Sequence, residues 1–351
     1  MPGFLSGLLH SKDALLVAEH DLGLHAGGVS EVAASRRWVA SAPSEGTEIR
    51  IWDVLNAQSL GTLKGHLKRV EALAISTNEN QIASGSEDGE VRIWDTTGLK
   101  ELARWQRSGP VSALAFTADG KSLAIAGSET TVSCVEISSG KEEQTFHLDS
   151  KSLKQILEKP PEKFSEVAIS PDQTRWAAIG GGLVVVWDVQ KGGAGKVHMT
   201  PPYSYHSLRF SSSGEHLLIA GGTFEVEIEF TAGGSTNAHF KNMGGVIVLL
   251  DVLSGKLHSV SKAETVFQNA AFSPEGEKVV ILAAAPPWKD GVRQWLCIHS
   301  TKEILSGTLR KPEDELELGQ GPLFMSSAFD PASSLVVFEK AKHVHLSQLK
   351  V

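Results

Sequence analysis

The chain has 351 residues, of which 41% are apolar and 21% charged, so it can bury a large core and is not expected to be disordered. Its 41 acidic and 33 basic residues give a formal net charge of −8, which argues against nucleic acid or a membrane as partner, because both attract basic surfaces. No run approaches the roughly eighteen apolar residues of a membrane span, and the opening MPGFLSGLLHSKD has no basic leader. We therefore expect a cytoplasmic protein.

Short strands separated by turns account for most of the sequence. Apolar or alternating runs are separated by Gly, Ser, Asn and Pro, and few segments keep the apolar period of a helix. In chain order, the first run is Ala14–Ala18 and the next begins near Val29. The two cysteines, Cys134 and Cys297, form no CxxC pair and fall within such runs, which predicts buried free thiols. The pattern predicts an all-β protein.

Three Trp-Asp pairs close strand-like runs at later points along the chain. They are Trp52-Asp53 in IRIWD, Trp94-Asp95 in VRIWD and Trp187-Asp188 in VVVWD. The first two pairs lie 42 residues apart, the spacing at which a four-stranded propeller blade repeats. The most complete unit is GHLKRVEALAISTNENQIASGSEDGEVRIWD, from Gly65 to Asp95. On these residues the chain resembles the WD40-repeat family of β-propellers, and the resemblance extends in weaker form over nearly all of it.

A second repeated feature supports the same architecture. An apolar residue followed by a small polar one recurs as Ile75-Ser76, Phe116-Thr117, Ile169-Ser170, Phe210-Ser211, Phe272-Ser273 and Phe329-Asp330. The bends that follow include TADGK, SPDQT, SSSGE and SPEGE, and such residues suit tight turns between antiparallel strands.

The spacing of the third strand in each unit gives a blade count. With strands named a to d in each blade, the positions that close strand c are Trp52-Asp53, Trp94-Asp95, Val135-Glu136, Trp187-Asp188, Leu250-Asp251, Ile298-His299 and Leu346-Ser347. They are separated by 42, 41, 52, 63, 48 and 48 residues. We predict one domain over residues 1–351, a seven-bladed β-propeller of four-stranded antiparallel blades.

The two ends of the chain predict how the ring closes. Too few residues follow Leu346 for a fourth strand in the last blade, whereas the run Ala14–Ala18 precedes strand a of the first. We expect an N-terminal strand, at about residues 13–19, to complete the last blade and remove its free edge.

The resemblance implies a polar network within the second blade. In the family, a His before strand a, a Ser or Thr on strand b, an Asp in the b–c turn and the Trp of strand c brace one another. The matching residues are His66, Ser84, Asp88 and Trp94. A Ser-His-Asp trio also permits a hydrolase triad, but we favour the structural interpretation because Ser84 falls within a strand. No residue set predicts a catalytic, cofactor or metal site.

Insertions indicate which rim of the propeller binds a partner. The d–a and b–c loops open on the rim of His66 and Asp88, and the a–b and c–d turns open on the other. Four long loops are assigned to the first rim: Asp149–Lys163, Thr223–Asn242, Ala284–Gly291 and Arg310–Gly321. Because loops on a rigid scaffold often carry binding residues, we expect this rim to be the binding face. The candidate contact residues are Tyr203 and Tyr205 in PPYSYHS, and Trp288, Lys289 and Asp290 in APPWKDG.

The predicted function is a non-enzymatic interaction platform that binds a protein or peptide on this rim. Such a propeller is expected to be a monomer within a complex, and a regulatory subunit of a larger assembly is an alternative. An enzyme with a site over the central channel is a further alternative. A channel-facing cluster of at least three His, Asp or Glu would favour that enzyme, and none can be identified from the sequence.

Overall fold

The structure is a computed structural model, and its description covers most of the chain. The described residues are 16–25, 28–128, 130–148, 161–192, 195–199, 204–230, 236–263, 265–273, 275–285, 292–309, 312, 314–321, 327–330, 335–340 and 343–349.

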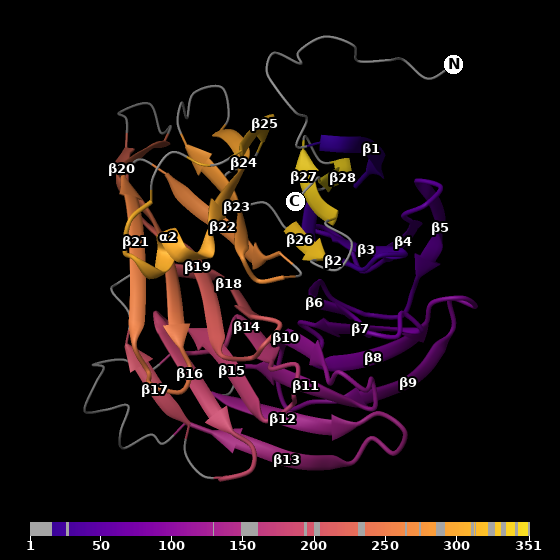
Figure 1. Ribbon diagram of the computed structural model, residues 1–351. Coiled ribbons are helices and arrows are strands. Elements are labelled where there is room, and N and C mark those ends of the chain that lie inside the picture. The colour runs from indigo at the N-terminus through magenta and orange to yellow at the C-terminus, as the bar shows by residue number, and fades with distance from the viewer. Residues whose placement is uncertain are drawn as a thin grey trace, which may run out of the picture.

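Six four-stranded antiparallel sheets are each built from consecutive strands and arranged as blades around a central axis (Figure 1). The first three blades contain β2 (Val29–Ala34), β3 (Trp38–Pro43), β4 (Ile49–Asp53) and β5 (Gln58–Leu63); β6 (Val70–Ile75), β7 (Gln81–Ser86), β8 (Glu90–Asp95) and β9 (Glu101–Gln106); and β10 (Val111–Phe116), β11 (Ser122–Gly127), β12 (Thr131–Glu136) and β13 (Glu142–His147). The next three contain β14 (Glu166–Ile169), β15 (Arg175–Gly180), β16 (Leu183–Asp188) and β17 (Lys196–Met199); β18 (Ser204–Phe210), β19 (His216–Phe230), β20 (Thr236–Asp251) and β21 (Leu257–Ala263); and β22 (Val266–Phe272), β23 (Lys278–Ala285), β24 (Val292–Ser300) and β25 (Asp314–Gly321).

A seventh four-stranded sheet is assembled from both ends of the chain. Its strand order is β1-β28-β27-β26, with bounds β1 (Leu16–Leu24), β26 (Ser327–Asp330), β27 (Leu335–Lys340) and β28 (His343–Leu349). The prediction of a seven-bladed propeller therefore needs correction. Six blades are continuous in sequence, and the remaining sheet is a composite of one strand from the start of the chain and three from its end.

The composite sheet joins the ends of the ring through antiparallel pairing. Strand β1 pairs with β28 from Leu16 opposite Leu349 to Leu24 opposite His343, with two register shifts. The strand extends to Leu24, five residues beyond the predicted end near residue 19. Strand β26 contacts both β22 of the sixth blade and β2 of the first. These contacts bring the last strands of the chain against the first blade.

The hydrophobic core lies between neighbouring blades. The first and second blades share a cluster that includes Ile49, Ile51, Ile82 and Trp94, all at most 3% exposed. Equivalent clusters join each later pair of described blades up to the sixth. Burying a side chain of this size contributes about 1.5–3 kcal/mol. Each blade thus depends on its neighbours for the burial of its two faces.

The Asp of each Trp-Asp pair holds the turn that follows strand c. Asp53 accepts a hydrogen bond from the backbone N–H of Asn56 at 2.9 Å, and Asp188 accepts from Lys191 at 3.1 Å. Asp251 does the same with Ser254 at 2.8 Å, although Leu250 replaces the Trp before it. The Lys191 side chain and then its backbone N–H lower the pKa of Asp188, and the Ser254 N–H lowers the pKa of Asp251. The Asp therefore stabilises the c–d turn whether or not a Trp precedes it.

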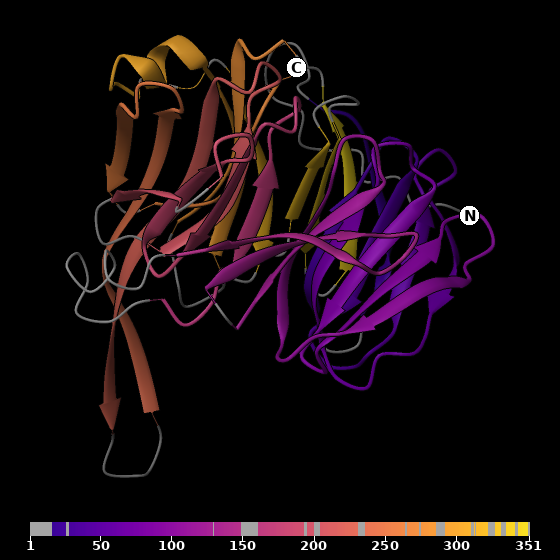
Figure 2. The same ribbon diagram turned by 90° about the horizontal axis from the view of Figure 1, so that it is seen from below.

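The fifth-blade segment predicted as a loop, Thr223–Asn242, is a projecting β-hairpin. Strands β19 and β20 stay paired as far as Phe230 opposite Thr236. Their outer neighbours stop earlier, at Gly222 for the pairing with β18 and at Gly244 for the pairing with β21. We call residues 223–243 the hairpin arm (Figure 2). The loop prediction was wrong because it followed the Gly-rich segment TAGGST and overlooked the run FEVEIEF before it, whose alternation indicates a strand.

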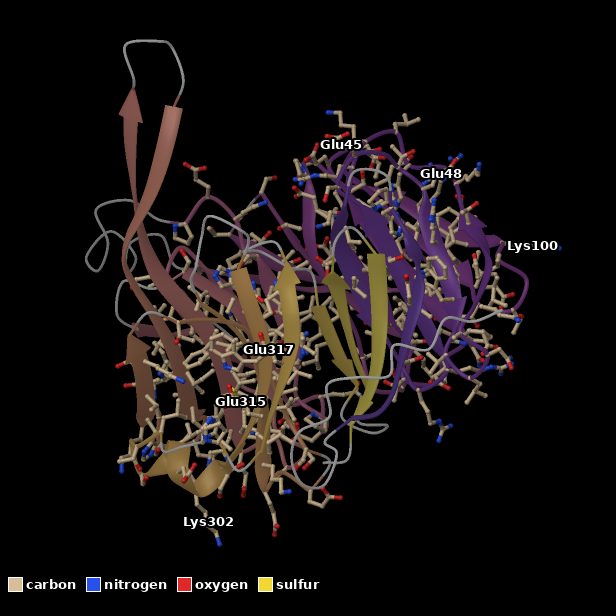
Figure 3. All side chains as sticks on the ribbon, turned by 90° about the horizontal axis from the view of Figure 1, so that it is seen from above. Glu45, Glu48, Lys100, Lys302, Glu315 and Glu317 are labelled. Atoms are coloured by element: carbon tan, nitrogen blue, oxygen red, sulfur yellow. The ribbon has the colours of Figure 1, made fainter. Side chains whose placement is uncertain are left out.

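The prediction of a d–a loop over Arg310–Gly321 is also wrong. Residues 314–321 form β25, the outer strand of the sixth blade, on which Glu315 and Glu317 are exposed and Leu318 is buried (Figure 3). The alternation in ELEL is a strand pattern that the many acidic residues obscured. The long connection of this blade instead lies between β24 and β25 and contains the short helix α2 (Thr301–Leu305). This insertion is on the a–b/c–d rim, opposite the hairpin arm (Figure 2).

Two smaller findings complete the fold. Cys134 and Cys297 are buried free thiols, as predicted, and burial raises the pKa of each thiol to about 12. Within the described part of the chain, no helix has the length and apolar character needed to cross a membrane.

Removing β1 tests the closure of the ring. Deletion of residues 1–24 leaves β28 with an unpaired edge, which should lower the thermal unfolding midpoint by at least about 10 °C, since each kcal/mol is worth about 2–4 °C in large domains. Differential scanning fluorimetry and light scattering measure the loss and any aggregation. Deletion of residues 1–12, which leaves β1 intact, is the control. Equal midpoints for both truncations would contradict closure by β1.

Candidate functional site

The four predicted bracing residues of the second blade are brought together by the structure. His66 Nε2 lies 2.7 Å from Ser84 Oγ, which also accepts a hydrogen bond from Trp94 Nε1 at 2.8 Å. His66 Nδ1 lies 3.2 Å from Asp88 Oδ2. A single tautomer satisfies every contact: Nδ1–H donates to Asp88, and Nε2 accepts from the Ser84 hydroxyl.

Electrostatics keep this network in one protonation state. Burial lowers the pKa of His66, and the opposing attraction of Asp88 does not reverse the shift. Burial alone would raise the pKa of Asp88, but N–H donors of Leu67 and Glu90 and the contact with His66 hold it below its usual value. The imidazole is therefore neutral and the carboxylate charged. Because Ser84 is fully buried and already accepts from Trp94, its hydroxyl is not placed to attack a substrate.

The same network explains the Gly that precedes His66. A Cβ on Gly65 would lie 2.1 Å from Arg92 Nη1, so only glycine fits there. Arg92 is buried, and its guanidinium forms ion pairs with Glu90 and Glu101 at 2.5 Å. His66, Asp88 and Glu90 hold potential metal-ligand atoms within 4.8 Å of one another. Each of these atoms already has a partner and Arg92 supplies the positive charge, so the group acts as a brace.

Other blades keep fragments of the network. In the first blade, His25 Nε2 lies 2.8 Å from Ser41 Oγ, and Trp52 Nε1 donates to the same hydroxyl at 2.9 Å. In the fourth blade, Ala178 pairs with Val185 as Ser84 pairs with Arg92. Trp187 Nε1 is consequently buried without a hydrogen-bond partner among the described residues, and the ring packs against Phe164 instead.

The structure separates the predicted contact residues. Tyr205 is in strand β18, is 7% exposed and packs in the core shared by the fourth and fifth blades, so it is not available as a surface anchor. The predicted loop PPYSYHS overlaps strand a of the fifth blade, which begins at Ser204, so the prediction of Tyr205 as a surface contact is wrong. Tyr203, Trp288, Lys289 and Asp290 lie outside the described residues. Their predicted role stays a prediction.

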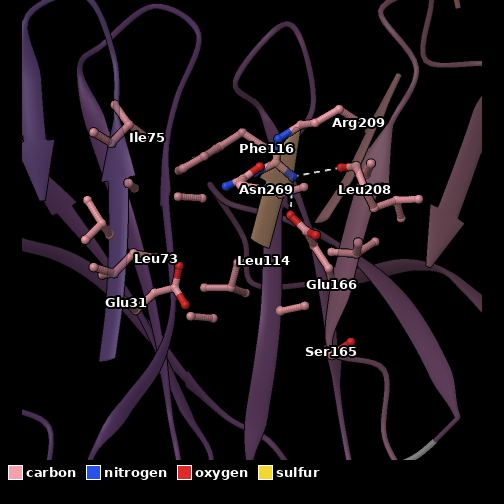
Figure 4. Close-up of a pocket in the computed structure, with 18 of the residues that line it drawn as sticks. Glu31, Leu73, Ile75, Leu114, Phe116, Ser165, Glu166, Leu208, Arg209 and Asn269 are labelled. Atoms are coloured by element: carbon pink, nitrogen blue, oxygen red, sulfur yellow. Dashed lines mark hydrogen bonds and ion pairs between the residues drawn. The ribbon is translucent and has the colours of Figure 1, made fainter. Parts of the chain in front are cut away.

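The innermost strands line a pocket of about 610 Å³ in the central channel (Figure 4). Its wall includes Glu31 of β2, Glu71 of β6, Glu166 of β14, and His206 and Arg209 of β18. Three carboxyl groups and an imidazole thus face the channel, the kind of cluster that could not be identified from the sequence. Most of the remaining positions on these strands are Ala, Ser, Val or Leu.

Two of the carboxyl groups have charged partners. Glu166 forms an ion pair with Arg209 Nη1, which also donates to the carbonyl of Leu208 at 2.7 Å (Figure 4). Glu71 Oε1 lies 2.5 Å from Arg69 Nη2, and Glu71 Oε2 lies 3.4 Å from Lys163 Nζ. Burial raises the pKa of Glu166 despite Arg209, and burial lowers the pKa of His206.

Glu31 lies across the pocket from the Glu166–Arg209 pair (Figure 4). Burial, followed by the negative charge of Glu166, raises the pKa of the Glu31 carboxyl to about 8, against the opposing effects of the Val32 N–H and of Arg209. At neutral pH this side chain is therefore mostly protonated in a channel that already holds other carboxylates.

A repeat within strand a places Glu31 and Glu166 at equivalent heights. The segments VSEVAA (29–34) and FSEVAI (164–169) share the residues SEVA. In both, an apolar residue and a Ser come directly before the Glu. The register agrees, because Glu31 pairs with Ala42 and Glu166 with Ile179, each the last residue but one of strand b. Comparison of the strand a segments was the signal that would have found the pair.

Comparisons with known proteins agree with this geometry. The family model "WD domain, G-beta repeat" matches residues 57–95, which span the second Trp-Asp pair. A solved β-propeller domain, Cps50 (Swd1) of Myceliophteria thermophila, superposes with a TM-score of 0.64 at 16% identity, covering 95% of this chain and 100% of that chain. The chain therefore contains a WD40 repeat and has the fold of a β-propeller.

Sequence relatives of this WD40 propeller include components of assemblies. Eukaryotic translation initiation factor 3 subunit I of Scheffersomyces stipitis is 24% identical over 66% of this chain and 64% of that protein. Small ribosomal subunit protein RACK1y of Oryza sativa subsp. japonica is 27% identical over 47% of this chain and 49% of that protein. The matches span less than two thirds of the length of these relatives. WD40 propellers of this kind are typically protein-interaction scaffolds within complexes.

Asp88→Ala tests the bracing role. The substitution removes the acceptor for His66 Nδ1 and for two backbone N–H groups, which should cost about 1–3 kcal/mol of unfolding free energy. Urea unfolding measures the loss. Glu87→Ala, which breaks only an exposed ion pair with Arg69 in the same turn, should cost less than about 1 kcal/mol. Equal stability of the two variants would refute the brace.

Glu31→Gln should change how stability depends on pH. The carboxyl pKa is 4.5 in the unfolded chain and about 8 in the folded protein, so unfolding releases a proton between these values. Stability should accordingly fall as pH rises from 4.5 to 8, with a contribution from this group of at most about 1.4 kcal/mol per pH unit. Urea unfolding at pH 5.5, 6.5 and 7.5 should show a flatter profile for Glu31→Gln. Exposed Glu45→Gln is the control, and identical slopes in all three proteins would refute the assignment.

Proposed function

We propose that this WD40 propeller is a non-enzymatic scaffold that binds a protein or peptide on its d–a/b–c rim, as a subunit of a larger assembly. The observation that carries the proposal is the hairpin arm. It extends the fifth blade beyond the reach of β18 and β21, on the rim of His66 and Asp88. The names of the two relatives above, an initiation factor subunit and a ribosomal subunit protein, support a role within an assembly.

The arm is suited to contact with another macromolecule. Residues 223–230 and 236–243 pair only with each other in the described sheet, and a two-stranded ribbon is marginally stable alone. A rigid blade holds its base, while its strands lie clear of the rest of the propeller (Figure 2). Such a ribbon gains stability when a partner covers it, and it offers a large contact area from a single element.

The cluster in the channel supports a second candidate, an enzyme with acid–base groups over the channel. Glu31, Glu71, Glu166 and His206 meet the criterion of three or more such groups. However, Glu71 and Glu166 are already engaged by cationic side chains, through Arg69 and Arg209. We therefore place the scaffold first and assign the channel a binding role below.

Replacing the arm tests the proposed function. Thr223 pairs with Gly244, so joining them through an Asn-Gly turn should preserve the four-stranded blade. Affinity purification from the native host, followed by quantitative mass spectrometry, should show at least a tenfold loss of specific partners, with an unchanged melting temperature.

Lys121→Glu provides the matched control on the opposite rim. It reverses a charge in the a–b turn of the third blade, where Lys121 donates only its backbone N–H to Asp119. Partner recovery should stay within about twofold of the wild type. Partners that survive removal of the arm but are lost in Lys121→Glu would place the binding face on the a–b/c–d rim.

A further inference from the structure

The channel wall contains a buried carboxylate oxygen that lacks a donor among the described residues. Glu166 Oε2 is buried and has no hydrogen-bond partner in the part of the chain that the structure describes, and Arg209 binds the other oxygen. Glu31 receives a hydrogen bond from the backbone N–H of Val32, and the described residues give it no ion pair of its own. Buried polar atoms are rarely left without partners unless another molecule supplies one.

The charges of this region are also unbalanced. Arg209 is the cation that acts on both Glu31 and Glu166, and it is bound to Glu166. Glu71, which acts on Glu31 as a further negative charge, has its own partners in Arg69 and Lys163. His206 from β18 faces the same pocket, and burial disfavours its charged form. When Glu31 is ionised, one additional positive charge would therefore neutralise the group formed by Glu31, Glu166 and Arg209.

The pocket has the shape and lining for a slender organic group. Its volume of about 610 Å³ is within the usual range of small-ligand sites. The carboxylates lie near the start of strand a, toward the rim of the hairpin arm, whereas Ile75, Phe116 and Phe210 end their strands at the far part of the pocket. Ala74 and Ala115 provide small apolar surfaces between these levels. An entering group would meet the carboxylates first and apolar side chains beyond them.

We propose that the central channel binds one organic cation, a guanidinium or an alkylammonium group, between Glu31 and Glu166. Several N–H donors on one charged group can satisfy Glu166 Oε2 and the Glu31 carboxylate together. A hard divalent ion would need at least six oxygen ligands and would lie beside the Arg209 guanidinium, which disfavours it. If an Arg or Lys side chain of a partner carries the cation, the inference rests on the proposed scaffold function; a free amine would not require it.

Calorimetric titration of the full chain at pH 7.5 tests the site. The probes are acetyl-Gly-Arg-Gly-amide, acetyl-Gly-Lys-Gly-amide, agmatine, n-butylammonium and, as a neutral analogue, the peptide with citrulline in place of Arg. At least one cationic probe should bind, and the citrulline peptide should bind at least tenfold more weakly. Stronger binding of the peptides assigns the site to a partner's side chain, and stronger binding of agmatine or n-butylammonium assigns it to a free amine.

Substitutions locate the cation within the channel. Glu31→Gln and Glu166→Gln should each weaken binding at least tenfold, whereas Glu45→Gln in the exposed b–c turn of the first blade should change it less than twofold (Figure 3). Because Glu31 must lose its proton to bind a cation, affinity for the wild type should rise between pH 6.5 and 8.5. That rise should be lost in Glu31→Gln, a result that a purely structural defect would not produce.

The inference is overturned if no cationic probe binds at millimolar concentration, if calcium or magnesium ions bind more tightly than all the probes, or if both Gln variants bind like the wild type. Its failure is distinguishable from that of the proposed function. Loss of partners on replacing the arm, with no binding of any cation, would leave the scaffold standing and remove the channel site. Binding of a cation in the channel, with no loss of partners on replacing the arm, would keep the channel site and contradict the assigned binding rim.

Discussion

Apolar packing between neighbouring blades is the constraint on which the rest of the structure depends. A four-stranded sheet has two faces, and in this protein each described face is covered by the next blade through clusters such as that of Ile51 and Ile82. The strands nearest the axis must consequently lie side by side. This arrangement creates the channel, fixes the direction of both rims and places equivalent residues of successive strands at the same height.

Strand order and bracing were predictable because they follow from local patterns. Five of the seven third strands end at the predicted residue, whereas β24 and β28 run on to Ser300 and Leu349. The four residues His66, Ser84, Asp88 and Trp94 form the expected hydrogen bonds. These features depend on period-two alternation and on the need of buried polar groups for partners. The buried thiols followed from the same alternation.

The wrong loop predictions arose where residue composition was given more weight than the alternation of apolar and polar residues. Acidic residues made β25 look like a loop, and glycines did the same for the hairpin arm. Tyr205 was assigned to a loop because prolines precede it, although it begins the buried part of a strand. The channel cluster was missed for a different reason. Its members come from four strands far apart in sequence, and only the ring brings Glu31 and Glu166 across from each other. A shared SEVA segment indicates equivalent positions, but their mutual repulsion is a property of the closed ring.

The pairing of β1 with β28 also has a consequence for the order of folding. Leu16 pairs with Leu349, so the edge strand at one end of the ring has no partner until nearly the whole chain is available. Contacts of such sequence separation form slowly, because a long loop must close before they are gained. During synthesis the early blades can assemble on one another while β1 stays unpaired, exposed to chaperones or to the β-strands of other nascent chains. We therefore expect completion of the ring to be the last step of folding, and with it the closure of the wall around the channel.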